Sequence, residues 1–198
     1  MVDANALIVF VRNPVLGNVK TRIAATLGNA DALAVYLVLL QHTKQLISPL
    51  RVSKHIFYAD QMNEDDLWNG NDKYLQVGET LGDRMKNAFD SVFEKGYKNI
   101  VIIGSDCFEL TEDILNYAFE NLHTSDIVIG PARDGGYYLL GMRAAHPYLF
   151  ENIQWSTETV FQQTIELVFK HNLSFILLPE LSDVDEAEDI TFDYKTNQ

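Results

Sequence analysis

The chain has 198 residues, of which 47% are hydrophobic and 22% charged, and this suits a single domain spanning residues 1–198 with a sizeable core. Its 28 acidic and 15 basic residues give a formal net charge of −13, which argues against binding to nucleic acid or to an anionic membrane surface. The single cysteine, Cys107, excludes an intramolecular disulfide, and no stretch reaches the roughly 20 apolar residues that a membrane helix needs. We therefore expect a cytoplasmic protein.

Short runs rich in Ile and Val alternate with helical patterns along the chain. The expected strands cover residues 6–12, 54–60, 99–106, 125–132 and 174–180, and the expected helices cover residues 29–47, 80–96, 111–122 and 156–172. The strand runs are apolar on both faces, which is typical of buried parallel strands. The alternation predicts a three-layer α/β/α sandwich around a mostly parallel sheet.

Three segments carry more specific local signals. Thr111, followed by acidic residues, is expected to cap one helix, and Ser156 or Thr157 is expected to cap the last one. The segment 135–143, "GGYYLLGMR", is bounded by glycine and aromatic, so it could pair antiparallel beside the parallel strands. An aromatic-rich edge at this segment could also support a homodimer.

The stretch "FVRNPVLGNVKTRIA" follows the first expected strand. Ligands of open α/β sheets bind at the carboxyl ends of strands, so polar residues placed there are candidate site residues. Gly17 could let backbone amides approach a phosphate, and the basic residues Arg12, Lys20 and Arg22 add positive charge. The spacing of a Walker loop is absent. On these residues alone, an ordinary strand–helix connection with solvated basic side chains is equally consistent.

Acidic residues follow two other expected strands. Asp106, in "GSD", ends the most apolar strand, where its carboxylate could bind a divalent cation or cap the next turn. The run "LSDVDEAEDI" (181–190) places Asp183, Asp185 and Glu186 after the last expected strand. Most acidic runs are solvated surfaces, but a second carboxylate that reached the same cation would complete a site that Asp106 begins.

The motif "GPARDGGYYLLG" places Asp134 before Gly135 and Gly136. This order is a tight-turn signal, and the two glycines would also let a ligand lie against the backbone. Tyr137 and Tyr138 could stack on a ligand, although packing in the core is the more common role of such tyrosines.

Together these motifs resemble a known family. The segments "FVRNPVLGNVKTRIA", "GETLGDRM", "GSDC", "GPARDGGYYLLG", "WST" and "DVDEAED" occur in the order seen in small bacterial GT-A-type, nucleotide-diphospho-sugar transferase-like proteins. These proteins are often labelled transferase 1 associated with radical-SAM/selenodomain genes, and they are assigned to arsenosugar biosynthesis as glycosyltransferases. The resemblance covers residues 6–190. More distantly, the chain is similar to the nucleotidylyltransferases for 2-phospholactate and for the molybdenum cofactor.

The resemblance implies a set of site residues. It implies a nucleotide over the loop after the first strand, held by Arg12, Gly17, Lys20, Arg22, Gly82 and Arg84. It implies Mg²⁺ or Mn²⁺ on Asp106, with Asp185 as a candidate second ligand. It places Asp134, Gly135, Gly136 and Tyr137 on the acceptor side, with Asp134 as a candidate general base and Asp106 as the other catalytic residue.

The implied reaction is transfer from a nucleotide-activated donor, most simply a nucleotide sugar, to a small-molecule acceptor. Nucleotidyl transfer is the alternative, in which a nucleoside triphosphate reacts with a phosphorylated small molecule and pyrophosphate is released. Nucleotide binding without catalysis is a third reading. Two departures from the family pattern bear on these readings: Phe108 stands where proline is usual after "GSDC", and Glu186-Ala187 replaces Thr-Pro. Neither departure removes a charged group.

Overall fold

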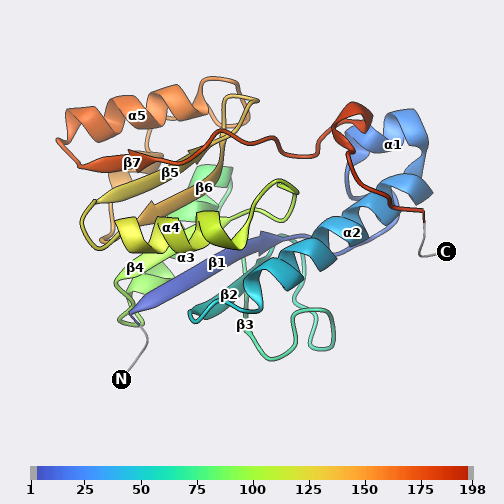
Figure 1. Cartoon of the computed structure of the whole chain (residues 1–198), viewed down its shortest axis with the longest axis horizontal. Coiled ribbons are helices and arrows are strands. Elements are labelled where there is room, and N and C mark those ends of the chain that lie inside the picture. Colours follow the sequence, from blue (N-terminus) through green and yellow to red (C-terminus); the bar gives the residue numbers. More distant parts are fainter. Residues whose placement is uncertain (1–3, 196–198) are drawn as a thin grey trace.

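The computed structural model describes residues 4–195, and these residues form a seven-stranded sheet flanked by helices (Figure 1). The strands are β1 (Asn5–Val11), β2 (Ser53–Tyr58), β3 (Asp72–Leu75), β4 (Asn99–Ile103), β5 (Ile127–Pro131), β6 (Tyr137–Met142) and β7 (Phe175–Leu177). Their spatial order is β3-β2-β1-β4-β6-β5-β7, and among these seven only β6 runs antiparallel to its neighbours. The expected mostly parallel sheet and the antiparallel pairing of β6 are confirmed.

Helices cover both faces of the sheet and form the outer layers. They are α1 (Thr21–Leu27), α2 (Asn29–Ile47), α3 (Leu81–Phe93), α4 (Glu112–Asn121) and α5 (Val160–Lys170), with short 3₁₀ turns η1 (Pro147–Phe150) and η2 (Ala187–Asp189). Side chains of successive β1 residues point to opposite faces of the sheet. Leu7 belongs to the core cluster that contains Leu40 of α2, and Ile8 belongs to the cluster that contains Phe89 of α3. In Figure 1, α2 and α4 lie in front of the sheet and α3 lies behind it. The three-layer α/β/α architecture is therefore confirmed.

The two expected helix caps have different outcomes. Thr111 caps α4 as expected, because its hydroxyl accepts the N–H of Ile114 at 3.4 Å. The expected cap at Ser156 or Thr157 is wrong, because α5 begins only at Val160. Ser156 has a φ of +63°, and the Thr157 hydroxyl donates to the carbonyl of Gln154 at 2.7 Å instead. Residues before α5 thus form a turn that remains available to line a site.

The position of β6 removes the basis for the expected dimer contact. β6 lies between β4 and β5, and the edges of the sheet are β3 and β7. Tyr138 is buried, and its hydroxyl donates to the carbonyl of Pro179 at 2.9 Å. The expectation that this segment forms an edge of the sheet is therefore wrong, and the homodimer stays a prediction. No helix within residues 4–195 has the length and apolar character needed to cross a membrane.

The register of the central strands decides where polar loops meet. β1 and β4 are parallel neighbours, with Val9 beside Ile103. The residues that follow these two strands, from Arg12 and from Gly104 onward, therefore emerge side by side at one edge of the sheet. This is the edge at which open α/β sheets bind ligands.

Candidate functional site

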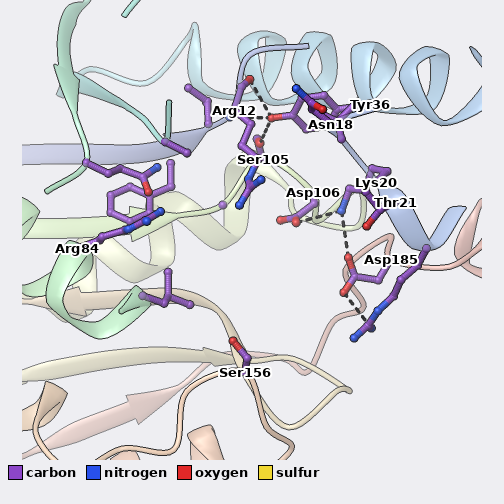
Figure 2. Close-up of a pocket in the computed structure, with 18 of the residues that line it drawn as sticks. Arg12, Asn18, Lys20, Thr21, Tyr36, Arg84, Ser105, Asp106, Ser156 and Asp185 are labelled. Carbon is purple, nitrogen blue, oxygen red and sulfur yellow. Dashed lines mark hydrogen bonds and ion pairs between the residues drawn. The ribbon is translucent and has the colours of Figure 1, made fainter. Parts of the chain in front are cut away.

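A cavity of about 620 Å³ opens at the carboxyl ends of β1 and β4 (Figure 2). We call it the first cavity. Its walls come from residues of the segments 10–22, 76–84 and 104–106, together with Tyr36, Ala59, Ser156 and, from the segment after β7, Asp185. Segments far apart in the sequence thus converge here, as the strand order requires.

Lys20 lies at the centre of a charged network in this cavity. Its backbone is left-handed, with φ of 45° and ψ of 53°, immediately before α1. Its Nζ donates to Asp106 Oδ2 at 3.1 Å and to Asp185 Oδ1 at 3.1 Å, and its side chain is only 8% exposed (Figure 2). Burial lowers the pKa of Lys20, but the two carboxylates outweigh burial and raise this pKa above its ordinary value. Lys20 therefore stays charged and joins the two predicted metal ligands.

Backbone contacts bring Asp185 beside Asp106. The N–H of Val184 donates to the carbonyl of Asp106 at 2.9 Å. The Asp189 carboxylate accepts the N–H groups of Asp185 at 3.0 Å and of Glu186 at 2.8 Å, and Glu186 and Asp189 form a capping box around η2. The chain thus keeps a capped turn after Asp185 although Glu186-Ala187 replaces Thr-Pro.

The three arginines of the first cavity differ in their partners. Arg22 is 70% exposed and lies 3.9 Å from Asp185. Arg84 donates through Nε to the carbonyl of Gly78 at 3.1 Å, and within residues 4–195 neither Arg84 nor Arg12 forms an ion pair. Arg12 and Arg84 are therefore the guanidinium groups of this cavity without a carboxylate partner.

Two glycines expected at the nucleotide lie outside the walls of the cavity. Gly17 has a φ of +81° in the loop before α1, a left-handed conformation that favours glycine. Gly82 is buried at the start of α3, where an added Cβ would overlap the ring of Trp155. Gly82 therefore shapes the site by letting Trp155 lie directly against α3.

A second cavity of about 570 Å³ adjoins the first, and Asp106 lines both. Its walls come from α3, the ends of β4 and β6, residues 155–160 and the segment after β7. Of the residues expected on the acceptor side, Asp134, Gly136 and Tyr137 line this second cavity, and Gly135 does not.

The Asp134 turn is built as its sequence predicts. Asp134 Oδ1 accepts the N–H of Gly136 at 2.8 Å. Gly135 has a φ of +87°, and an added Cβ would overlap the backbone of Glu158. The hydroxyl of Tyr137 donates to the sulfur of Met85 at 3.9 Å, and burial raises the pKa of Tyr137. Tyr137 therefore packs against Met85 and also forms part of the wall of the second cavity.

Asp183 is a site residue that the sequence analysis did not assign. It lines the second cavity, and its buried Oδ1 has no hydrogen-bond partner among the residues that the structure describes. Burial raises the pKa of Asp183 to about 8, and the charges of Asp106 and Asp134 act in the same direction. Asp183 and Asp185 lie two residues apart in a segment that follows a strand. This spacing was the sequence signal that the two side chains point to the same side.

Two aromatic residues also escaped the sequence analysis. The hydroxyl of Tyr36, on α2, accepts the N–H of Arg12 at 2.9 Å and donates to its carbonyl at 3.2 Å. It also lies 3.5 Å from the hydroxyl of Ser105, so it ties the end of β1 to the loop after β4. Trp155 lines the second cavity from the turn before α5. Both positions depend on contacts between distant segments.

The carboxylates suit a divalent cation that is bound together with phosphate. Oxygen atoms of Asp106, Asp183 and Asp185 are the hard ligands that Mg²⁺ and Mn²⁺ prefer, and the buried Asp183 Oδ1 accepts no hydrogen bond from any residue that the structure describes. Within residues 4–195, no three His, Cys, Asp or Glu side chains gather closely enough to hold a metal ion on their own. Water molecules or phosphate oxygens would have to complete the coordination.

Solved structures share this architecture. One is a protein from Desulfovibrio desulfuricans G20 that is provisionally described as a nucleotide-diphospho-sugar transferase. It is 33% identical, with a TM-score of 0.88, and the match covers 94% of this chain and 84% of that one. The expected resemblance to nucleotide-diphospho-sugar transferase-like proteins is thereby confirmed.

More distant structures share the fold alone. The inositol-1-phosphate CTP transferase from T. maritima has a TM-score of 0.52 at 12% identity, and the match covers 94% of this chain and 91% of that one. Rv0371c from Mycobacterium tuberculosis H37Rv, solved in complex with manganese, has a TM-score of 0.54 at 13% identity, with 93% and 94% covered.

Sequence comparison places the chain in a family. No curated protein matches the sequence. The pattern of one bacterial family matches residues 29–157, which is more than half of the chain. The chain therefore belongs to the family described as "Uncharacterized protein conserved in bacteria (DUF2064)".

Proposed function

We propose that the protein is a metal-dependent transferase that uses a nucleotide-activated donor, and that it transfers a glycosyl group to a small-molecule acceptor. The observation that carries this proposal is the first cavity, in which Arg12 and Arg84, unpaired among the residues that the structure describes, line the same space as Asp106 and Asp185. A bound nucleoside diphosphate is stabilised by positively charged side chains and by a divalent cation. The first cavity contains arginines that could contact the phosphates and carboxylates that could hold the cation. The 33% identical D. desulfuricans protein supports the same reaction class.

The basic residues of the first cavity have separate roles in this proposal. Arg12 and Arg84 bind the phosphate oxygens, because a guanidinium group can donate two parallel hydrogen bonds to a phosphate. Lys20 holds Asp106 and Asp185 in place through its two 3.1 Å contacts. Negative charge that develops on the leaving nucleoside diphosphate is thereby met by fixed positive groups.

Asp106 and Asp185, with Asp183 beside them, are the residues that would hold Mg²⁺ or Mn²⁺. When bound, the cation supplies further charge neutralisation for the leaving diphosphate. The manganese complex of Rv0371c, which shares the fold, is consistent with this assignment.

The second cavity is the place for the acceptor in this proposal. Asp134 is exposed at its wall, and Oδ1 is occupied by the N–H of Gly136. Oδ2 has no hydrogen-bond partner among the residues that the structure describes, so it can accept a proton from an acceptor hydroxyl group. Asp134 is thus the proposed general base.

Nucleotidyl transfer is the second candidate, because the CTP transferase from T. maritima shares the fold. The two reactions use the same donor cavity and differ in the atom attacked, which is a sugar carbon in one and the α-phosphorus in the other. Their products therefore distinguish them.

The test is incubation with Mn²⁺ and a panel of nucleotide sugars and nucleoside triphosphates, with candidate acceptors. Release of a nucleoside diphosphate, abolished in Asp106→Asn, is the expected result. Release of pyrophosphate would overturn the glycosyl-transfer proposal. Binding that ignores the metal and survives Asp106→Ala would favour a non-catalytic nucleotide-binding protein. If neither nucleotide nor Mn²⁺ raises the melting temperature, both enzymatic proposals fail.

A further inference from the structure

The two cavities differ sharply in charge. The first is lined by four basic and three acidic side chains, whereas the second is lined by one basic and five acidic side chains. Those of the first are Arg12, Lys20, Arg22 and Arg84 against Glu79, Asp106 and Asp185; those of the second are Arg22 against Asp106, Asp134, Glu158, Asp183 and Asp185. The charges of the first cavity therefore attract a phosphate group, whereas those of the second cavity repel it.

The negative character of the second cavity does not depend on the proposed metal ligands. Asp134 and Glu158 form no ion pair with any basic side chain in the part of the chain that the structure describes. Arg22, the single basic residue of this wall, already lies 3.9 Å from Asp185. The second cavity would thus stay acidic even when Asp106 and Asp185 are neutralised by Lys20 and a cation.

Apolar and aromatic side chains form another part of the second cavity's wall. Phe10, Met85, Tyr137 and Trp155 contribute to its walls. Trp155 is held in place because it lies against Gly82 and stacks on Phe150, with ring centroids 6.4 Å apart and planes at 21°. A flat aromatic surface packs against the C–H face of a sugar or polyol, and carboxylates accept hydrogen bonds from its hydroxyl groups.

We infer that the acceptor in the second cavity is a hydroxyl-rich compound without anionic groups, and that phosphorylated acceptors are excluded by the carboxylates of Asp134 and Glu158. This inference rests on the proposed function, because it takes the first cavity as the place of the donor phosphates. It separates the two candidate reactions, since nucleotidyl transfer to a phosphorylated small molecule would bring a phosphate against these carboxylates.

Matched pairs of probes test the inference: glucose against glucose 6-phosphate, and glycerol against sn-glycerol 3-phosphate. Binding is followed by ligand-observed NMR and by tryptophan fluorescence, with Trp155→Phe as the control for the signal from the cavity. We expect each phosphorylated probe to bind at least tenfold more weakly than its neutral partner. The difference should shrink at high salt, because added ions screen the repulsion.

A charge-reversal variant tests whether the acidic side chains cause the weaker binding of phosphorylated probes. Glu158 is exposed and belongs to the turn before α5, so Glu158→Lys should fold. This variant should reduce the discrimination against phosphorylated probes at least threefold. Glu151→Lys, which makes the same change of net charge at an exposed residue outside both cavities, should leave it unchanged.

The comparison is made with and without saturating Mn²⁺ and nucleoside diphosphate, and calorimetry measures nucleotide binding separately. Loss of nucleotide binding would contradict the proposed function, whereas the probe pairs measured without nucleotide still test the second cavity. The inference is overturned if a phosphorylated probe binds as tightly as its neutral partner, if neither probe binds, or if the Glu158 and Glu151 variants behave alike.

Discussion

The ammonium group of Lys20 lies 3.1 Å from a carboxylate oxygen of Asp185, a residue 165 positions away in the sequence. This contact joins the loop after β1 to the segment after β7, and a second contact at 3.1 Å joins both to Asp106. Bases and acids of the first cavity are therefore in direct contact. Lys20 thus contacts both carboxylates, whereas Arg12 and Arg84 form no ion pair within residues 4–195.

Lys20→Ala should weaken nucleoside diphosphate binding about tenfold, which corresponds to about 1.4 kcal/mol. The side chain removed is a buried charge that orients two carboxylates. The fold should survive, because the side chains of Asp106 and Asp185 are 37% and 45% exposed and water can solvate them. Titration calorimetry and circular dichroism measure the two effects.

Lys98→Ala is the matched control, since Lys98 is exposed and lines neither cavity. It should leave the nucleotide affinity unchanged. An unaltered affinity in Lys20→Ala would show that the Lys20 network has no part in the donor site.

The three arginines of the first cavity should contribute unequally to donor binding. Arg12→Ala and Arg84→Ala should each raise the dissociation constant for nucleoside diphosphate about tenfold, because each removes a guanidinium group that pairs with no carboxylate in the described part of the chain. Arg22→Ala should raise it less than about threefold, because Arg22 is mostly exposed and lies near Asp185. Arg51→Ala, at an exposed position away from both cavities, serves as the control. Equal losses for Arg12, Arg22 and Arg84 would contradict this order.

The architecture was readable from the sequence where the elements are long or fully buried. The strand runs around β1 and β4 are apolar on both faces, and α2 spans the residues 29–47 that its pattern predicts. The missed elements are short and weakly patterned. β3 has four residues, none of them buried, and α1 has seven residues with Ile23 as its only buried side chain. Their places are set by tertiary contacts rather than by local preference.

The cavity walls were readable only where their residues lie in the segments that follow strands. Motif position pointed to Lys20, Asp106 and Asp134, and all three line one of the two cavities. It did not reveal that Trp155 lies against Gly82, because this contact links the turn before α5 to the start of α3. The late start of α5 also contradicts a local capping signal, so the turn that lines the second cavity could not be read from the sequence.

Gly82→Ala should destabilise the protein by about 1–3 kcal/mol, because the added methyl group would overlap the ring of Trp155. In a Trp155→Ala background the same substitution should cost much less, because the ring that it meets is gone. A double-mutant cycle from urea unfolding measures this coupling. Additive free energies of unfolding would show that the contact between residues 82 and 155 does not constrain the packing.

Asp126→Asn should destabilise the protein by about 1 kcal/mol at neutral pH, a modest value because solvent partly screens the carboxylate. Asp126 accepts the hydroxyl and N–H of Ser174 at 2.6 and 2.9 Å, and Nε of Arg143 at 2.9 Å. These contacts, those of Ser174 first, lower the pKa of Asp126 in the folded state. The stabilisation is therefore present above the unfolded-state pKa of about 3.9 and is lost as the pH falls through the lower folded-state value. The unfolding free energies of wild type and Asp126→Asn should converge as the pH falls below the lowered folded-state pKa of Asp126. Glu120→Gln, on the exposed face of α4, should show no such convergence. A gap between wild type and Asp126→Asn that stays constant through the acid range would contradict the assignment.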